Sequence, residues 1–323
     1  MQHRSLVLGL RRRAGTAWLV VMAGAGFGAV GLGADPGGDR VTGDAVIRGP
    51  AGGSEIVMTT TSRLAGAIHS LTWNGREFID SLDHGRQLQS AANFDVDGRF
   101  HPETFNPTEA GAERDMDGPT STSRILWLSA AGRDLQTLNR MAFWLRPGQS
   151  SGGHPAFNTT PLSNHLLQKH VQIGAPGLEH AIRYEVAFTV PADERHTRAA
   201  FELVTGYMPA AFRSFHALRA DGQLEPLTDG PGEQALPVLV STADGGHAMG
   251  VWTAEVARTT KKPATYGRFW FEEAQVSKWN CVVRETAEPG GVLAPGVYRA
   301  LVWVAVGTRE QVRETLVRLR AGP

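Results

Sequence analysis

The chain has 323 residues, of which 41% are hydrophobic and 20% charged, a balance typical of a globular protein with a substantial core. Lysine plus arginine and aspartate plus glutamate each number 32, and no basic stripe with interleaved aromatic residues occurs, so no nucleic-acid partner is expected. The single cysteine, Cys281, can form no internal disulfide, and its apolar, alternating context indicates a buried strand residue rather than a nucleophile.

The first 34 residues differ from the rest of the chain. Arg4 and the run Arg11, Arg12 and Arg13 precede an apolar segment rich in Gly and Ala, which is the pattern of a secretory signal peptide over 1–34. Twin-arginine export is possible, and a retained membrane anchor is the alternative, because the segment approaches the roughly 20 residues that a span needs. We expect a secreted or periplasmic protein without membrane contact after cleavage. Cleavage removes four arginines and no acid, leaving 28 basic and 32 acidic residues.

Residues 35–53 are rich in Gly and Asp and predict a flexible lead-in. Beyond them, short runs with β-branched or aromatic residues at a period of two alternate with turn residues. These runs cover 55–61, 67–73, 123–130, 138–145, 166–174, 180–191, 198–209, 236–242, 248–254, 267–273, 275–285 and 297–307. Asn74-Gly75 predicts a two-residue hairpin, and only the last segment predicts a helix, capped by Thr308 with Gln311 at the capping-box position. We therefore predict one all-β domain over 54–323, a large antiparallel sandwich with a short C-terminal helix.

The stretch 83–111, DHGRQLQSAANFDVDGRFHPETFNPTEAG, is rich in charged and amide side chains. Long connections of this kind inside a compact domain are usually functional, so we expect the site here. An extended HGRQLQ would place His84 and Arg86 on one face, where a guanidinium suits a carboxylate or vicinal hydroxyls. The alternative is a surface ion pair of Arg86 with Asp80 or Asp83.

NPTEAG, at 106–111, is the second candidate motif. The proline at 107 favours an extended Asn106, whose amide is then free to bind. Glu109 is flanked by small residues and is expected to open into a cleft as a general acid, a general base or an acceptor for sugar hydroxyls. A turn with a solvated Glu109 is the alternative.

Other polar residues along the strands complete the expected site. The predicted catalytic residues are Glu109, His84, His101, His165 and Tyr207, and the predicted substrate-binding residues are Arg86, Gln89, Asn106, Glu233, His247, Lys278 and Asn280. The tryptophans at 127, 144, 252, 270, 279 and 303 lie in apolar runs and are expected in the core, with one or two available as a sugar-stacking platform.

Several motifs are absent from the sequence. It contains no P-loop, no GxGxxG after a strand, no GxSxG and no HExxH, so neither a nucleotide cofactor nor serine-hydrolase chemistry is expected. We predict no cofactor and no metal site, although ligands distant in sequence would leave no such motif.

The early Asn-Gly hairpin, the Arg-containing HGRQLQ, the pair Asn164-His165 and the closing aromatic strand VYRALVWVAVG resemble the galactose mutarotase-like supersandwich. That superfamily includes aldose epimerases and domains of glycosidases and polysaccharide lyases. In the epimerases a histidine acts as the acid and a late glutamate as the base. His165 matches the first only in part, and no late glutamate has a recognisable setting.

The leading hypothesis is an exported carbohydrate-active enzyme with acid/base chemistry on a sugar or uronate-containing glycan, either a glycoside hydrolase or a polysaccharide lyase. If it hydrolyses, Glu109 should face Asp95, Asp97 or Glu233 across a cleft; if it eliminates, Tyr207 is the candidate base. The alternatives are a non-catalytic glycan-binding or cell-surface domain, an aldose epimerase-like enzyme, and an enzyme with a His/Asp/Glu metal site. The expected partner is a carbohydrate, and the oligomeric state is left open.

Overall fold

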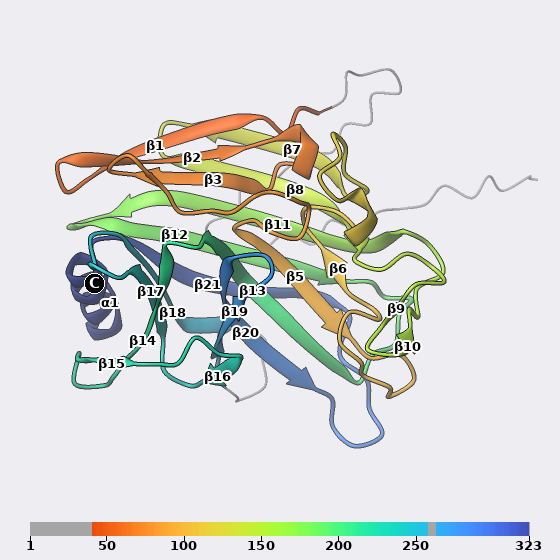
Figure 1. Ribbon diagram of the computed structural model, residues 1–323. Helices are drawn as coiled ribbons and strands as arrows, with labels where there is room; N and C mark the ends of the chain where they lie inside the picture. Colours follow the sequence, from red (N-terminus) through yellow and green to blue (C-terminus); the bar gives the residue numbers. More distant parts are fainter. Residues whose placement is uncertain (1–40, 258–262, 323) are drawn as a thin grey trace, which may run out of the picture. The chain divides into compact units, whose positions relative to one another are not determined.

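The computed structural model describes residues 41–257 and 263–322, and of residues 254–257 it describes the backbone alone. These residues belong to one compact unit, Asp39–Pro323. The signal peptide expected over 1–34 lies outside the described residues. The described chain forms two main antiparallel sheets, a two-stranded ribbon and one α-helix (Figure 1).

The smaller sheet has the order β1-β2-β3-β4, with bounds Ala45–Ala51, Ser54–Thr60, Ile68–Trp73 and Arg76–Glu77. The ribbon pairs β9, Ser150–Ser151, with β10, His154–Pro155. Two short 3-10 helices, Ser62–Leu64 and Glu113–Asp115, lie between strands. The Asn74-Gly75 turn joins β3 to β4 with Trp73 opposite Arg76, so the predicted hairpin is confirmed.

The large sheet has 15 strands. In spatial order they are β15 Leu224–Pro226, β14 Phe212–Leu218, β17 Val238–Thr242, β18 Ala248–Ala257, β21 Gly296–Gly307, β12 Leu178–Val190, β11 Leu162–Ala175, β8 Asp134–Phe143, β6 Pro107–Thr108, β5 Gln89–Phe94, β13 Arg198–Pro209, β20 Val276–Thr286, β19 Thr265–Phe271 and β16 Gly232–Gln234, while β7, Arg124–Ala131, pairs with β8.

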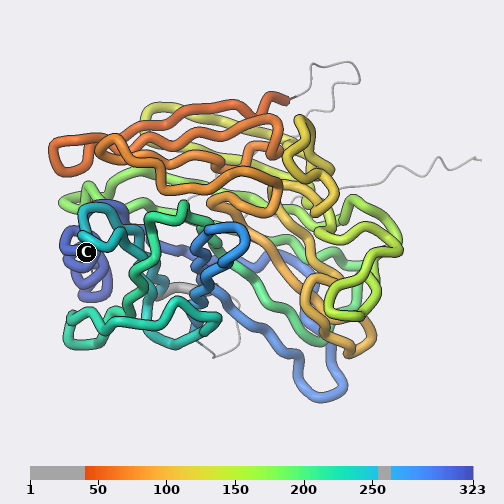
Figure 2. The backbone as a smooth tube through the Cα atoms, in the orientation of Figure 1, coloured from red at the N-terminus to blue at the C-terminus, as the bar shows by residue number. Residues whose placement is uncertain are grey.

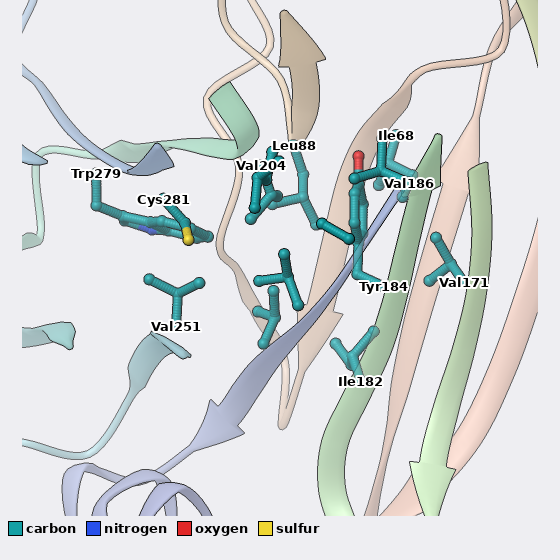
Figure 3. Close-up of a cluster of buried hydrophobic side chains, with 14 of the residues drawn as sticks. Ile68, Leu88, Val171, Ile182, Tyr184, Val186, Val204, Val251, Trp279 and Cys281 are labelled. Atoms are coloured by element: carbon teal, nitrogen blue, oxygen red, sulfur yellow. The ribbon is translucent and has the colours of Figure 1, made fainter. Parts of the chain in front are cut away.

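The core shows why this large sheet forms a sandwich. Trp279 and Cys281 of β20 point toward Val251 of β18 (Figure 3), although the two strands are far apart in the strand order. The sheet therefore curves until its inner faces meet, and apolar residues of β1, β2 and β3 join the same core. Buried and less buried residues alternate along β8 and β11, because successive side chains of a strand point to opposite faces of the sheet. The predicted all-β antiparallel sandwich is confirmed.

The C-terminal helix α1, Arg309–Ala321, is also confirmed. The backbone N–H of Gln311 donates to the Thr308 hydroxyl, and the Gln311 side chain accepts from the backbone N–H of Thr308. Val312, Leu316 and Leu319 are buried against a second apolar cluster that includes residues of β12, β17, β18 and β21. In the described part of the chain, no helix combines the length and the apolar character needed to cross a membrane.

Two expectations are wrong. The lead-in expected over 35–53 contains β1, which pairs with β2 along its whole length. The stretch 83–111 is not one long connection, because it contains β5 and β6, which lie between β13 and β8 in the large sheet (Figure 1). Figure 2 shows the backbone of this stretch in orange. Asp95, Asn106 and Glu109 of this stretch are buried, and their side chains form hydrogen bonds inside the sandwich, as buried polar groups usually do. Residues 84–87 form a turn rather than the expected extended strand.

Candidate functional site

Glu109 does not open into a cleft. Its side chain is fully buried and forms an ion pair with the equally buried Lys169 of β11. The backbone N–H of Ser90 donates to Oε2 of Glu109 at 3.0 Å, and the Ser90 hydroxyl lies 2.9 Å from the Tyr184 hydroxyl. Glu109 is therefore part of a charged network inside the sandwich. Both of its carboxylate oxygens have partners, and the side chain has no exposed surface. A substrate therefore cannot reach Glu109, and the prediction that it is catalytic is wrong.

Three more predicted residues hold the backbone together. The ring nitrogens of His84 lie 2.6 Å and 2.9 Å from the carbonyl oxygens of Met116 and Arg63. The Gln89 amide donates to the carbonyl of Gly85 and accepts from the backbone N–H of Ala110, and the Asn106 amide donates to the carbonyl of Ala92. All three side chains are buried, so the structure gives them positioning roles rather than contact with a ligand.

Three other predicted site residues, His101, Glu233 and His247, each contact a different part of the structure. His101 stacks on His154 of β10, with ring centroids 3.5 Å apart. Glu233 of β16 makes a two-pronged ion pair with Arg284, at 2.6 Å and 2.8 Å. His247 packs its ring edge-on against Trp73 and is not among the residues that line the cleft described below.

The predicted hydrolytic pairs do not form either. The carboxylate of Asp95 is buried and accepts from the backbone N–H groups of Gly98, Thr197 and Arg198. Since Glu109 is buried in its own ion pair, neither member of the Glu109–Asp95 pair is free to act on a substrate.

A cleft of about 560 Å³ brings together two of the predicted residues, Arg86 and Tyr207. It is lined by the turn before β5, by Trp144 beyond the end of β8, by Tyr207 near the end of β13, and by the hairpin that joins β19 to β20. The backbone N–H of Asp80 donates to the carbonyl of Tyr207 at 2.8 Å, which ties the turn to β13. We call this hollow the cleft, lined by Asp83, Gly85, Arg86, Glu103, Trp144, Tyr207, Trp270, Phe271, Glu272, Glu273, Ala274 and Val276.

Arg86 is held by two carboxylates at the edge of the cleft. Its Nε donates to Asp83 at 2.9 Å and its Nη1 lies 3.4 Å from Asp80, so the ion pair considered as an alternative is present. The side chain keeps a fifth of its surface exposed. An arginine fixed in this way keeps its remaining N–H groups available to hydroxyl oxygens.

Tyr207 stands in front of a charged pair. Lys278 lies on the neighbouring strand with Nζ 5.3 Å from the centroid of the Tyr207 ring, and its partner is Glu202 at 3.6 Å. The hydroxyl of Thr205 donates to Glu202 at 2.6 Å, and Asn280 accepts from the backbone N–H of Gly267 at 2.9 Å. Lys278 and Asn280, predicted to bind substrate, are thus behind the cleft and support its wall.

The electrostatics of this group favour one protonation state. Burial raises the pKa of the Tyr207 hydroxyl, and the nearby Lys278 charge offsets only part of that rise. Burial alone would raise the pKa of Glu202 and lower that of Lys278. Their mutual attraction, together with the hydrogen bonds of Glu202 to Thr205 and Asn280 and the effect of Tyr207 on Lys278, outweighs burial, so the pKa of Glu202 is lowered and that of Lys278 is raised. Tyr207 is therefore a hydrogen-bond donor at neutral pH and a poor general base, against its predicted role in an elimination.

The cleft also contains residues that the sequence pattern assigned elsewhere. Trp144 and Trp270, expected in the core, line the cleft, while Trp279 is fully buried as expected. The Phe271 ring lies parallel to that of Tyr207, with centroids 6.4 Å apart, and is 42% exposed. Their place in the sequence could have indicated a role in the site, because Trp144 and Phe271 lie where the strand periodicity ends and turn residues begin.

His165 lies elsewhere in the sandwich. It is buried on β11, with Nε2 2.7 Å from the carboxylate of Glu194 in the connection between β12 and β13. It does not line the cleft.

No protein-family model and no curated protein matches this chain. Among solved structures it is similar to the Slr1438 protein of Synechocystis sp. PCC 6803, with a TM-score of 0.42, 12% identity, and coverage of 84% of this chain and 97% of that one. It is also similar to a candidate mutarotase of Salmonella typhimurium, with a TM-score of 0.34, 8% identity and coverage of 82% and 94%. For the alpha-galactosidase of Lactobacillus brevis the TM-score is 0.45 and the identity 9%, with coverage of 86% and 42%, so this chain spans less than half of that enzyme.

These three structures have TM-scores below 0.5 and identities of 12% or less. The likeness concerns the arrangement of strands. No residue role is transferred from them.

Proposed function

We propose that this protein is a carbohydrate-active enzyme that binds a sugar in the cleft. The observation that carries the proposal is the combination, in one hollow, of Trp144, Trp270 and Phe271 with Arg86 and several carboxylates. A pyranose ring offers an apolar C–H face that packs on an aromatic ring, and its hydroxyls bond to charged groups around the rim. The cleft provides both kinds of surface.

The charge of the cleft favours a neutral sugar over a uronate. Its lining includes four carboxylates, Asp83, Glu103, Glu272 and Glu273, against the single guanidinium of Arg86. Arg213 lies 3.5 Å from Glu272 and offsets part of this charge. Because Arg86 is already paired with two aspartates, a uronate carboxylate would add to an excess of negative charge. We therefore favour hydrolysis or epimerisation over elimination.

Acid/base chemistry would come from exposed carboxylates of the cleft together with Tyr207. Glu103 is exposed, and its carboxylate accepts from the Ser151 hydroxyl at 2.7 Å. The protonated Tyr207 hydroxyl can donate to an oxygen of the substrate. We further propose that the enzyme is exported, on the strength of the basic and apolar pattern over residues 1–34.

The test is a panel of neutral and acidic glycans offered to the full chain. Binding and the release of reducing sugar are measured for the wild type, Trp270→Ala and Glu103→Gln. Trp127→Ala, which removes a half-buried tryptophan of β7 outside the cleft, is the matched control. We expect Trp270→Ala to weaken binding, Glu103→Gln to lower turnover, and the control to change neither. Turnover that is unaffected by both cleft variants would contradict the proposal.

A non-catalytic glycan-binding domain is the second candidate. It is favoured by a specific observation, since the predicted acid/base residues Glu109, His84 and His165 are buried away from the cleft. Binding of a glycan by the wild type, lost in Trp270→Ala and without turnover across the panel, would establish this candidate in place of the enzyme.

A further inference from the structure

Three ligating side chains meet at a point outside the cleft. His165 comes from β11, while Glu194 and His196 come from the segment 191–197 that joins β12 to β13. The two Nε2 atoms approach the same carboxylate oxygen of Glu194, at 2.7 Å and 3.0 Å, and one ligating atom from each residue lies within 4.8 Å of the others. We call this group the His-Glu-His cluster. None of its members lines the cleft.

The hydrogen bonds of His196 orient both of its ring nitrogens. Nδ1 of His196 is 2.6 Å from the carbonyl oxygen of Asp95. Because a carbonyl oxygen can only accept, Nδ1 carries a proton. Nε2 therefore is the ring nitrogen available to a metal ion, and it points at the Glu194 carboxylate oxygen.

The surroundings match those of a metal ligand set. A histidine that binds metal usually donates its other ring N–H to a carbonyl or carboxylate, as His196 does to Asp95. The Asp95 carboxylate accepts from Thr197 and Arg198, which fixes the segment that carries both Glu194 and His196. Hydrogen bonds to the backbone carbonyl and to the carboxylate of Asp95 therefore fix the position of the cluster.

An apolar shell surrounds the two rings. The Phe94 ring lies 4.6 Å from the ring centroids of both histidines, and both rings are nearly fully buried. Glu194 keeps 19% of its side chain exposed, which gives an ion a path from solvent. Burial of this kind strengthens the attraction between a cation and the carboxylate.

We propose that the His-Glu-His cluster is a binding site for a divalent transition metal ion, with zinc the preferred ion. Two imidazoles and one carboxylate form a ligand set that zinc uses with a fourth position left for water or substrate. Bonds of about 2.0–2.2 Å at a tetrahedral centre place ligating atoms roughly 3.3 Å apart. The two distances from histidine Nε2 to the Glu194 oxygen, 2.7 Å and 3.0 Å, therefore need to lengthen by only about half an ångström. The two histidines supply nitrogen ligands, which disfavours calcium and magnesium.

The test uses the full chain stripped of metal by a chelator and then titrated with Co²⁺ and Zn²⁺. We expect one Co²⁺ per chain with visible absorption bands of a low-coordinate site, and displacement of Co²⁺ by Zn²⁺. Glu194→Gln and His196→Gln should each weaken Zn²⁺ binding by about 100-fold or more, since the loss of an outer-shell partner alone costs 10–100-fold. His69→Gln, a histidine of β3 that bonds to Thr59, is the matched control and should leave binding unchanged.

Circular dichroism checks that each variant is folded. If a variant does not fold, anomalous X-ray scattering at the zinc edge from crystals of the wild type decides the matter instead. A peak between the three side chains supports the proposal. No Co²⁺ bands from a folded, metal-free chain, or a zinc peak elsewhere, would overturn it and leave the cluster as an ion pair with a doubly protonated histidine.

Discussion

The buried pair of Glu109 and Lys169 gives the sharpest prediction for stability. Glu109→Gln removes one charge from a pair in which both side chains have no exposed surface. The Lys169 ammonium then remains buried without a counter-charge, because the nearby Tyr184 ring, 5.8 Å from Nζ, is a weak substitute. Removing one partner of a buried ion pair typically costs about 3–5 kcal/mol. For a compact unit of this size that corresponds to a fall in Tm of roughly 5–9 °C.

The assay is thermal unfolding of four proteins: the wild type, Glu109→Gln, Lys169→Met and the double variant. Each single variant should lose several degrees, and the double variant should lose clearly less than the two losses combined, because neither charge is then stranded. Sugar binding below the unfolding transition should be unchanged in Glu109→Gln. A Glu109→Gln protein with the Tm of the wild type but without turnover would refute this reasoning and restore a catalytic role.

Three further predictions follow from the packing and charge of the fold. Glu202→Gln should be less stable than the wild type at neutral pH. The difference in free energy of unfolding should shrink as the pH falls below 4.5, because a carboxylate with a lowered pKa stabilises the fold only while it is ionised. Chemical denaturation at several pH values measures that difference. Thr308→Ala removes the cap of α1 and should cost about 1 kcal/mol in the same measurement. Gly206→Ala places a Cβ 2.5 Å from the buried ring of Trp279 and should cost about 1–3 kcal/mol, whereas an unchanged Tm would show that the ring can move.

The sequence predicted the strands well because the evidence for them is local. The alternation in RAAFELVTGYMP matches β13 from Arg198 to Pro209, and the cap at Thr308 begins α1 as expected. The strand β14, Phe212–Leu218, was missed, because its residues follow closely on β13. The pairing of strands far apart in sequence has no local signature, so the curvature of the large sheet could not be read in advance.

The site was harder to predict because polarity does not distinguish burial from exposure. The stretch 83–111 was expected to be a long polar connection that carries the site, yet the side chain of its Glu109 is paired with Lys169, a long way along the chain, and the pair is buried. Conversely, Trp270 looked like a core residue but lies at the cleft beside Glu272, at the end of β19. Both outcomes depend on tertiary neighbours that composition does not reveal. Arg86 and Tyr207 were found because each sits at a break in the strand pattern.

Calorimetric titration of the best-binding neutral glycan into the wild type, Trp270→Ala and Trp127→Ala tests the sugar-binding cleft most directly. The account predicts that Trp270→Ala weakens the affinity by about tenfold or more, a loss of about 1.4 kcal/mol, while Trp127→Ala binds like the wild type. Equal affinity in all three proteins, or an equal loss in both tryptophan variants, would contradict the assignment of the cleft.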